Sequence, residues 1–326
     1  MKLAFELSGE STSIPRAEVR AVFRGTVVRE LDRVLVLDVP AYDPVLGERL
    51  AMSHAVIEVH DICAQNLAAI YHAARDMELP DVRIAVRAKR IGNGLRSTDV
   101  ETVIGKALYE RGYHIDLTRP ELTIRALLSG HSCVMGSVLT LVNRAHFASR
   151  SPRVRPFFYP GVLLPRMARA VVNLAGAQPH TLLLDPFCGT GGILLEAGLV
   201  GVGIVGSDAD TRMVHGAKRN LEYYDVAGEL TVQDARQLGF RDRSIDAIVT
   251  DLPYGRSVSI RAGSIRQLRE EALDEMFRVL RARGRAVLLS HVAFDDELER
   301  AGFRLEARHH HYVHKSLTRE IIVAHK

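Results

Sequence analysis

The chain has 326 residues, of which 47% are hydrophobic and 25% charged, and its formal net charge is +4. This is the composition of an ordinary globular protein, and the length suits two or three domains better than one. No apolar run approaches the roughly 20 residues that a membrane-spanning helix needs, and Glu6 interrupts the N-terminal stretch where a signal peptide would be apolar. We therefore expect a soluble, cytoplasmic protein.

The first half of the chain alternates short strands and helices. Most of its candidate strands are β-branched or alternate apolar with polar residues, and they lie at Lys2–Leu7, Arg33–Val39, Ser53–Val59, Val82–Ala88, Leu122–Leu128 and Val134–Val142. The candidate helices are Pro15–Arg24, Cys63–Asp76 and Val100–Arg111. The last is predicted to start at Thr98, because Glu101 three residues later would complete a capping box, and to end at Gly112.

Positive charge gathers in the middle of the chain. Residues 81–169 contain 15 Lys or Arg and 6 Asp or Glu, a local net charge of +9, so the rest of the chain carries −5. A basic region of this kind is typical of a surface that binds a polyanion, although a solvated basic surface would look the same. Charge alone thus favours nucleic-acid binding without establishing it.

A change of composition marks the predicted domain boundary. Residues 149–165 contain four prolines and three arginines. Proline fixes φ and removes a backbone donor, so we predict a linker here. The predicted divisions are an α+β subdomain at 1–50, a second α+β domain at 51–148 and an α/β domain at 166–326.

The second half of the chain is an α/β series. Its predicted strands are Thr181–Asp185, Gly203–Asp208, Glu229–Gln233, Ile245–Asp251, Arg285–His291, Arg304–His314 and Arg319–His325. Its predicted helices are Arg166–Ala175, Gly192–Leu199, Asp210–Tyr224, Ser264–Arg281 and Asp295–Ala301. Strands separated by helices pair in parallel, whereas the last two, joined by a few residues, can pair only antiparallel. The predicted fold is a mostly parallel, Rossmann-like sheet that ends in an antiparallel hairpin.

The strongest local feature is a glycine-rich turn in TLLLDPFCGTGGILLEAG, residues 181–198. In open α/β sheets a ligand binds at the carboxyl end of a strand, and glycine lets the backbone approach it closely. The turn lacks the Lys and Ser/Thr of a phosphate loop, and Leu194 stands where a dinucleotide fingerprint has its third glycine. The residues predicted to bind a cofactor here are Asp185, Pro186, Phe187, Cys188, Gly189, Thr190 and Gly191.

Acidic residues also end the next two strands. Asp208 lies 23 residues after Asp185, near the spacing at which a carboxylate accepts hydrogen bonds from a ribose diol. Asp210 could instead be the N-cap of the helix that follows. Asp234 could accept from an adenine amino group, or it could be an ordinary turn residue. We predict that Asp208 and Asp234 bind the cofactor.

The fourth strand ends in a short motif that can carry chemistry. Asp251-Leu252-Pro253-Tyr254 resembles the D/N-P-P-Y/F motif of methyltransferases that act on planar amino nitrogens. The lone pair of a base amino group is delocalised into the ring, so an acceptor such as Asp251 helps the nitrogen to attack a sulfonium methyl. The turn would aim a backbone carbonyl at the same group, and Tyr254 would stack on the extruded base. Leu252 departs from the first proline of the motif and would supply its carbonyl with a looser backbone.

Cysteine and histidine are predicted to carry no chemistry. The three cysteines, Cys63, Cys133 and Cys188, are far apart and lack C-x-x-C spacing, which argues against disulfides and cysteine-based zinc sites. The fourth strand end has no cysteine nucleophile of the kind that cytosine C5-methylation requires. Three of the C-terminal histidines, 309–311, are consecutive, and neighbouring residues of a strand face opposite sides, so we expect no metal.

Together these motifs resemble the family of archaeal tRNA guanine-10 N2-methyltransferases, in which a THUMP RNA-binding domain is joined to a Rossmann-like methyltransferase domain. The similar segments are Phe157–Ala175, residues 185–197, residues 251–257, His314–Arg319, Val86–Arg90, Ile104–Tyr109 and Asp116–Leu122. The resemblance implies that 51–148 is a THUMP domain, that S-adenosyl-L-methionine is the cofactor, and that N2 of a tRNA guanine receives one or two methyl groups. We expect a monomer.

The resemblance further implies that the THUMP domain holds tRNA through phosphate contacts, which position without reading sequence. The candidate contact residues are Arg87, Lys89, Arg90, Arg150, Arg153 and Arg155, any of which could be a solvated surface residue. Two alternatives stay open: an adenine N6-methyltransferase acting on RNA or DNA, and a non-catalytic RNA-binding protein of the same fold.

Overall fold

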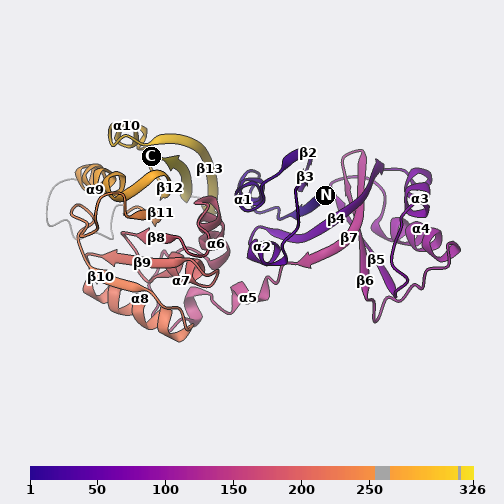
Figure 1. The fold of residues 1–326 in the computed structure, drawn as a ribbon, viewed down its shortest axis with the longest axis horizontal. Helices are drawn as coiled ribbons and strands as arrows, with labels where there is room; N and C mark the ends of the chain where they lie inside the picture. The colour runs from indigo at the N-terminus through magenta and orange to yellow at the C-terminus, as the bar shows by residue number, and fades with distance from the viewer. Residues whose placement is uncertain (254–264, 315–316) are drawn as a thin grey trace. The chain divides into compact units, whose positions relative to one another are not determined.

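The computed structural model describes residues 1–253, 265–314 and 317–326. The chain forms two compact units, Met1–Asn143 (unit 1) and Arg144–Lys326 (unit 2), both drawn in Figure 1. Within the described residues no helix is long and apolar enough to cross a membrane.

Unit 1 is an α+β unit built on one sheet. Its strands are β1 (Lys2–Leu7), β2 (Thr26–Leu31), β3 (Val34–Asp38), β4 (Ser53–Ala64), β5 (Ile84–Ile91), β6 (Leu122–Ser129) and β7 (Ser132–Leu141), in the order β2-β3-β1-β4-β7-β6-β5. β5 and β6 pair in parallel and the other neighbours pair antiparallel. Because β4 pairs with β1 on one side and β7 on the other, the predicted subdomain 1–50 and domain 51–148 share this sheet.

Four helices accompany the sheet of unit 1: α1 (Ile14–Val22), α2 (Pro44–Arg49), α3 (Leu67–Arg75) and α4 (Ser97–Glu110). Buried side chains of α3, α4 and the strands β5 to β7, among them Ile70, Ile104 and Ile124, form one apolar cluster. α3 and α4 thus cover the apolar face of this part of the sheet, which would otherwise be exposed to water.

The sequence predictions for unit 1 need three corrections. β2 and α2 were missed, and residues 63 and 64 belong to β4 instead of α3. The predicted capping box is wrong: Arg96 is the N-cap of α4, and the Glu101 carboxylate accepts a hydrogen bond from the backbone of Ala88 at 2.7 Å. Gly112 does follow the helix with a positive φ of 92°, the left-handed conformation expected beyond a helix end.

Unit 2 contains a second seven-stranded sheet. Its strands are β8 (Leu182–Asp185), β9 (Gly203–Asp208), β10 (Glu229–Val232), β11 (Ile245–Asp251), β12 (Leu280–Ser290), β13 (Arg304–His314) and β14 (Leu317–His325), in the order β10-β9-β8-β11-β12-β14-β13. β8 to β12 pair in parallel, and β14 pairs antiparallel with β12 and β13. This confirms the predicted Rossmann-like sheet with a terminal hairpin.

The remaining elements of unit 2 are α5 (Ala145–Ala148), the 3₁₀ turn η1 (Pro152–Val154), α6 (Pro165–Leu174), α7 (Gly192–Gly198), α8 (Thr211–Tyr223), α9 (Ile265–Val279) and α10 (Asp295–Arg300). Residues 149–165, predicted as a linker, fall within unit 2 and contain η1. Proline at the start of this turn removes a donor that the turn does not use, so a proline-rich segment can be ordered here. Pro152 and Arg155 are both buried.

The order of strands decides where a site can lie. From β8 the chain adds β9 and β10 on one side and then returns to place β11 on the other. The strand order thus reverses between β8 and β11, and ligands of open α/β sheets bind beyond the carboxyl ends of such strands. Those two ends carry Asp185 and Asp251.

Candidate active site

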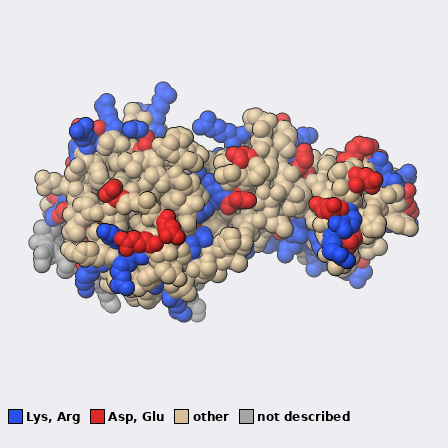
Figure 2. Space-filling view, turned by 60° about the horizontal axis from the view of Figure 1, so that its bottom comes forward, with Lys and Arg blue, Asp and Glu red and all other residues tan. Residues whose placement is uncertain are grey.

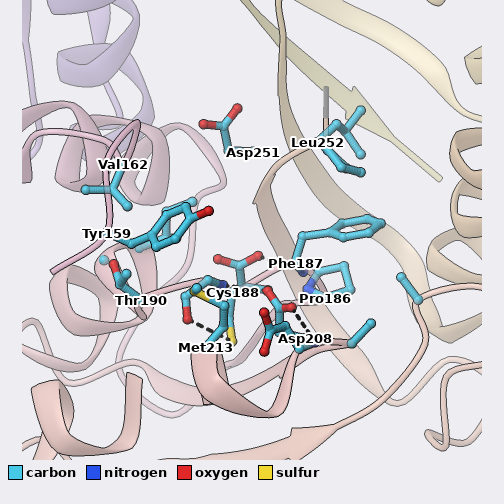
Figure 3. Close-up of a pocket in the computed structure, with 18 of the residues that line it drawn as sticks. Tyr159, Val162, Pro186, Phe187, Cys188, Thr190, Asp208, Met213, Asp251 and Leu252 are labelled. Atoms are coloured by element: carbon cyan, nitrogen blue, oxygen red, sulfur yellow. Dashed lines mark hydrogen bonds between the residues drawn. The ribbon is translucent and has the colours of Figure 1, made fainter. Parts of the chain in front are cut away.

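A cavity of about 1050 Å³ lies at the carboxyl ends of β8, β9, β10 and β11. This volume is at the upper end of the ~300–1,000 Å³ common for ligand pockets, so it can take more than one small group. Its walls are residues 159–163, the glycine-rich turn, and the residues that follow β9, β10 and β11. In Figure 3, Asp251 lies across the pocket from Cys188 and Asp208, with Tyr159 on one side and Phe187 on the other.

The glycine-rich turn has a left-handed backbone at two positions. Gly189 has φ +50° and Gly191 has φ +76°, and the backbone N–H of Gly191 donates to the carbonyl of Cys188 at 2.8 Å. A Cβ at Gly191 would lie 3.1 Å from Cβ of Ala217 on α8, whereas a Cβ at Gly189 would meet no atom within 4 Å. Gly191 therefore lets α7 and α8 pack closely, and Gly189 leaves space at the cavity wall.

Asp185 supports this turn from below. Its Oδ1 accepts hydrogen bonds from Thr250 Oγ1 at 2.7 Å and from the backbone of Phe187 at 3.2 Å. The residue is 1% exposed, and burial raises its pKa to about 7, with smaller contributions from the nearby carboxylates. Asp185 thus ties the end of β11 to the turn.

Asp208 and Asp210 have separate tasks. Asp208 accepts from the backbone of Gly189 at 3.0 Å and from that of Asp210 at 2.9 Å, and burial raises its pKa. Asp210 is the N-cap of α8, where its carboxylate accepts from the backbone of Arg212 at 2.9 Å. Of the two, Asp208 is the one held against the glycine-rich turn.

Asp234 lines the cavity but is already engaged. Arg236, two residues later, donates to both carboxylate oxygens at 2.7 to 3.1 Å, and this hydrogen bonding lowers the pKa of Asp234. The predicted contact with an adenine amino group would have to be made beside this ion pair. Arg236 was not predicted from the sequence.

Asp251 is the acidic residue on the opposite wall. Its Oδ2 lies 3.3 Å from Nη2 of Arg319, and its Oδ1 is buried with no hydrogen-bond partner among the described residues. Burial raises the pKa of Asp251 to about 6, and Arg319 acts in the opposite direction. The cavity wall therefore presents an ionisable oxygen that can accept a hydrogen bond.

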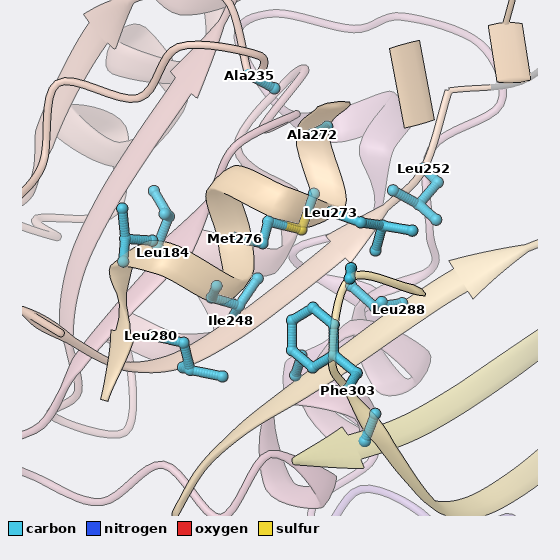
Figure 4. Close-up of a cluster of buried hydrophobic side chains, with 14 of the residues drawn as sticks. Leu184, Ala235, Ile248, Leu252, Ala272, Leu273, Met276, Leu280, Leu288 and Phe303 are labelled. Atoms are coloured by element: carbon cyan, nitrogen blue, oxygen red, sulfur yellow. The ribbon is translucent and has the colours of Figure 1, made fainter. Parts of the chain in front are cut away.

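Leu252 corrects one expectation. Its backbone N–H donates to the carbonyl of Leu289 at 2.9 Å, and its side chain is 1% exposed in a core cluster. Figure 4 shows Leu252 near Leu273 and Leu288. A proline could not donate this bond, so leucine anchors the backbone at this position and does not loosen it. Pro253 lines the cavity, and Tyr254, predicted to stack on a base, lies outside the described residues.

Asn220 is a site residue that was not predicted from the sequence. It is fully buried on α8, and its Nδ2 donates to the carbonyls of Phe157 and Thr190, both at 2.9 Å. Its Oδ1 accepts from the backbone of Phe157 at 2.8 Å. One amide side chain thus joins the segment before the cavity to the glycine-rich turn. Its partners are 63 and 30 residues away, and no local pattern reveals them.

The six predicted RNA contacts fall into different environments. Lys89, Arg90 and Arg153 are exposed. Arg87 is half-buried and donates to the carbonyls of Val86 and Leu117. On the face that Figure 2 presents, basic side chains lie among acidic ones and do not form a uniform basic face.

Arg150 and Arg155 are weaker candidates for RNA contacts, because both are largely buried in unit 2. Arg150 pairs with the fully buried Glu196 at 2.8 Å, and Glu196 also pairs with Arg169 at 2.8 Å. Arg155 is 5% exposed, and its Nε donates to the carbonyl of Arg150. These two arginines are part of the interior of unit 2.

Cys63 and Cys133 face each other across β4 and β7, Cys188 is buried beside the cavity, and all three are free thiols. Within residues 1–253, 265–314 and 317–326, no three His, Cys, Asp or Glu side chains are grouped to hold a metal ion.

Comparison with known proteins agrees with this geometry. A family model described as an RMKL-like methyltransferase domain matches residues 152–321. The chain is 36% identical to the tRNA (guanine(10)-N2)-dimethyltransferase of Methanothermobacter thermautotrophicus, over 99% of each chain. It is 30% identical to the protein of that name from Methanocaldococcus jannaschii, over 98% of this chain and 99% of the other. The crystal structure of TrmN from Thermus thermophilus has the same fold, with a TM-score of 0.57 and 23% identity over the whole of both chains.

Proposed function

The chain belongs to the RMKL-like methyltransferase family and, within it, to the group of the archaeal tRNA (guanine(10)-N2)-dimethyltransferases, and on this premise we propose that it transfers methyl groups from S-adenosylmethionine to N2 of guanine 10 in tRNA. The observation that carries the proposal is the unpartnered Oδ1 of Asp251 on the wall of a cavity that the glycine-rich turn closes on the other side. The two relatives are named dimethyltransferases, so we include a second transfer that yields N2,N2-dimethylguanosine.

The cavity fits S-adenosylmethionine by the chemistry of its walls. The open space above Gly189 admits a ligand against the backbone, and the Asp208 carboxylate stands beside it to accept from ribose hydroxyls. Apolar surface comes from Pro186, Phe187 and Cys188. We propose that Asp185 and Thr190 shape this half of the cavity and that Asp234, with Arg236, borders the adenine.

When bound there, S-adenosylmethionine supplies a sulfonium methyl, whose carbon–sulfur bond breaks, with its electron pair passing to sulfur, as the carbon–nitrogen bond forms. Asp251 Oδ1 accepts a hydrogen bond from the guanine amino group, which draws the nitrogen toward a tetrahedral geometry and frees its lone pair. The carbonyl of Leu252, whose backbone is fixed by the bond to Leu289, accepts from the same amino group. After transfer the surplus proton on nitrogen passes to the Asp251 carboxylate and then to water.

We propose that most of the rate acceleration comes from positioning the two reactants. Holding the amino nitrogen and the methyl carbon in line removes much of the entropic barrier to a two-reactant step. The base has to leave its stack to enter the cavity, and Tyr254 is proposed to stack on it there. Leu252 and Pro253 directly precede this tyrosine in the chain.

We propose that unit 1 holds the tRNA through phosphate contacts from Lys89 and Arg90, with Arg153 of unit 2 as a further contact, because these side chains are exposed. Arg87 is a weaker candidate, since its guanidinium is used on backbone carbonyls. The enzyme is proposed to act as a monomer in the cytoplasm, where its proposed substrate is processed.

The test is incubation of the purified protein with unmodified tRNA transcripts and methyl-labelled S-adenosylmethionine, followed by nucleoside analysis. We expect label in N2-methylguanosine and N2,N2-dimethylguanosine, and none with Asp251→Asn, which should still bind S-adenosylhomocysteine. Label in N6-methyladenosine would agree with the assignment of the active site and contradict the proposal that guanine is the substrate. No label, despite cofactor binding by the wild type, would favour a non-catalytic RNA-binding protein.

A further inference from the structure

We propose that Arg319, in the C-terminal hairpin, is a positioning residue for methyl transfer: it holds one oxygen of the Asp251 carboxylate so that the other faces the substrate amine. This inference rests on the proposed function, because it concerns the residue assigned as the acceptor of the amino group. Arg319 lies on β14, 68 positions after Asp251 in the chain, and it is the last residue of the segment His314–Arg319.

The geometry around Arg319 joins three segments of unit 2. Its Nη2 lies 3.3 Å from Oδ2 of Asp251 and donates to the carbonyl of Gly161 at 2.8 Å. Gly161 lines the cavity and has a positive φ of 89°. The guanidinium therefore links the end of β11 to the cavity segment 159–163, and β14 carries it because that strand is inserted between β12 and β13.

Burial strengthens this ion pair. The side chain of Arg319 is 5% exposed and that of Asp251 is 19% exposed, so water screens the pair poorly. A planar guanidinium has its donors in a fixed fork, and here Nη2 donates to the Gly161 carbonyl and lies 3.3 Å from Oδ2 of Asp251. With Oδ2 held in this way, rotation of the carboxylate is restricted, and Oδ1 is the oxygen left for a substrate hydrogen bond.

Arg319 is also the cation that keeps Asp251 ionised. A further charged group close to Asp251 is the Asp185 carboxylate on β8, whose pKa the Asp251 charge helps to raise. His291, after β12, has its pKa lowered by burial and by the nearby Arg319, so it adds no positive charge at neutral pH. Without Arg319, burial would act on Asp251 unopposed, and its pKa would rise above about 6.

A protonated Asp251 would donate from one oxygen and lose its capacity to take the proton from nitrogen. Removal of Arg319 should therefore act on the reaction through the pH dependence of the rate, and not through cofactor affinity. A residue that only supported the fold would lower the amount of active enzyme equally at every pH.

The experiment compares wild type, Arg319→Gln and Arg319→Lys in single-turnover methylation of a tRNA transcript from pH 5 to pH 9. We expect the wild-type rate to fall below about pH 6. Arg319→Gln should lower the rate at pH 7 by about tenfold or more and move the acid limb upward by roughly one to three pH units. Arg319→Lys keeps the charge and should return the limb toward its wild-type position. Arg285→Gln, which removes a partner of Glu306 from the middle of β12, is the matched control and should leave the profile unchanged.

A second readout does not depend on activity. Aspartate labelled with ¹³C at the carboxyl carbon reports the titration of Asp251, with Asp251→Asn used to assign its signal. We expect the midpoint for Asp251 to be higher in Arg319→Gln than in the wild type, with S-adenosylhomocysteine affinity unchanged. If both the rate profile and the carboxyl titration keep their wild-type midpoints, the role of Arg319 is overturned. If the wild type methylates no RNA while the titration still moves in Arg319→Gln, the proposed function fails and the hold of Arg319 on Asp251 stands.

Discussion

The backbone N–H of Leu252 donates a hydrogen bond to the carbonyl of Leu289 at 2.9 Å, at the point where β11 has just ended beside β12. The motif that this segment resembles has proline at position 252, which has no N–H. In the motif, the proline ring restrains the backbone at this position. Here a hydrogen bond from the leucine N–H to the neighbouring strand holds the backbone instead.

Replacing this leucine by proline tests the value of the bond. Leu252→Pro should lower the free energy of unfolding by about 1–3 kcal/mol, because the buried carbonyl of Leu289 loses its partner. Leu252→Met keeps the N–H and nearly the same volume, and should cost less than ~1.5 kcal/mol. Urea denaturation measures both. Equal stability of Leu252→Pro and the wild type would mean that the bond contributes nothing.

The pKa of Asp185 makes stability depend on pH. Burial raises its pKa to about 7, against an ordinary value near 3.9, so between these values the folded state binds a proton that the unfolded state has lost. The stability from this group is complete below about pH 4 and is lost as the pH rises toward 7. Asp185→Asn cannot titrate, yet its Oδ1 can accept from the same two donors, Thr250 and Phe187.

We therefore expect the variant to gain stability relative to the wild type by up to ~1.4 kcal/mol per pH unit between about pH 4 and pH 7, and no more above that range. Urea denaturation followed by circular dichroism at pH 5, 6, 7 and 8 gives the difference directly. A difference that stays constant across this range would show that Asp185 titrates normally in the fold.

Asn220 should couple stability to cofactor binding. Asn220→Ala leaves the N–H and carbonyl of Phe157 and the carbonyl of Thr190 without their partner, and should cost about 2–4 kcal/mol. Because Thr190 belongs to the glycine-rich turn, affinity for S-adenosylhomocysteine should fall as well. Arg219→Ala, at the neighbouring exposed position of α8, is the control and should stay within about 0.5 kcal/mol. If calorimetry shows unchanged S-adenosylhomocysteine affinity in Asn220→Ala, the Asn220 amide does not support cofactor binding by the turn.

Exposed and buried basic residues should behave differently. Lys89→Gln and Arg90→Gln should weaken tRNA binding and reduce the slope of log affinity against log salt by about 1 for each phosphate that is no longer neutralised. Arg150→Gln should leave that slope unchanged and instead lower the free energy of unfolding by about 2 kcal/mol, because Glu196 is buried and is left with one of its two partners. A smaller slope of log affinity against log salt for Arg150→Gln would show that Arg150 does contact RNA.

The strands β8, β9 and β11 of unit 2 could be predicted because each is a short, mostly apolar run that ends in an aspartate, and their parallel order follows from the helices between them. The glycine-rich turn could be predicted for the same local reason. Arg319 and Asn220 could not, since each acts on partners that only the sheet order and the helix packing bring near.

Predictions from local sequence patterns also failed where a residue distant in the chain binds the same side chain. Glu101 has the spacing of a capping residue, but the backbone of Ala88 on β5 takes its carboxylate. Arg150 and Arg155 have the composition of a basic linker, but Glu196 gives the first an interior partner, and both are packed within unit 2. Charge counted along a sequence does not distinguish an arginine on the surface from one that neutralises a buried carboxylate.

The most direct test of the proposed reaction uses two tRNA transcripts that differ only at position 10, one with guanosine and one with inosine, which lacks the exocyclic amine. Both are incubated with the enzyme and labelled S-adenosylmethionine, and incorporation is measured. We predict label in the guanosine transcript, up to two methyl groups for each tRNA, and none in the inosine transcript. Equal labelling of both transcripts would contradict the proposed reaction, because the accepting atom would then be some other nitrogen of the tRNA.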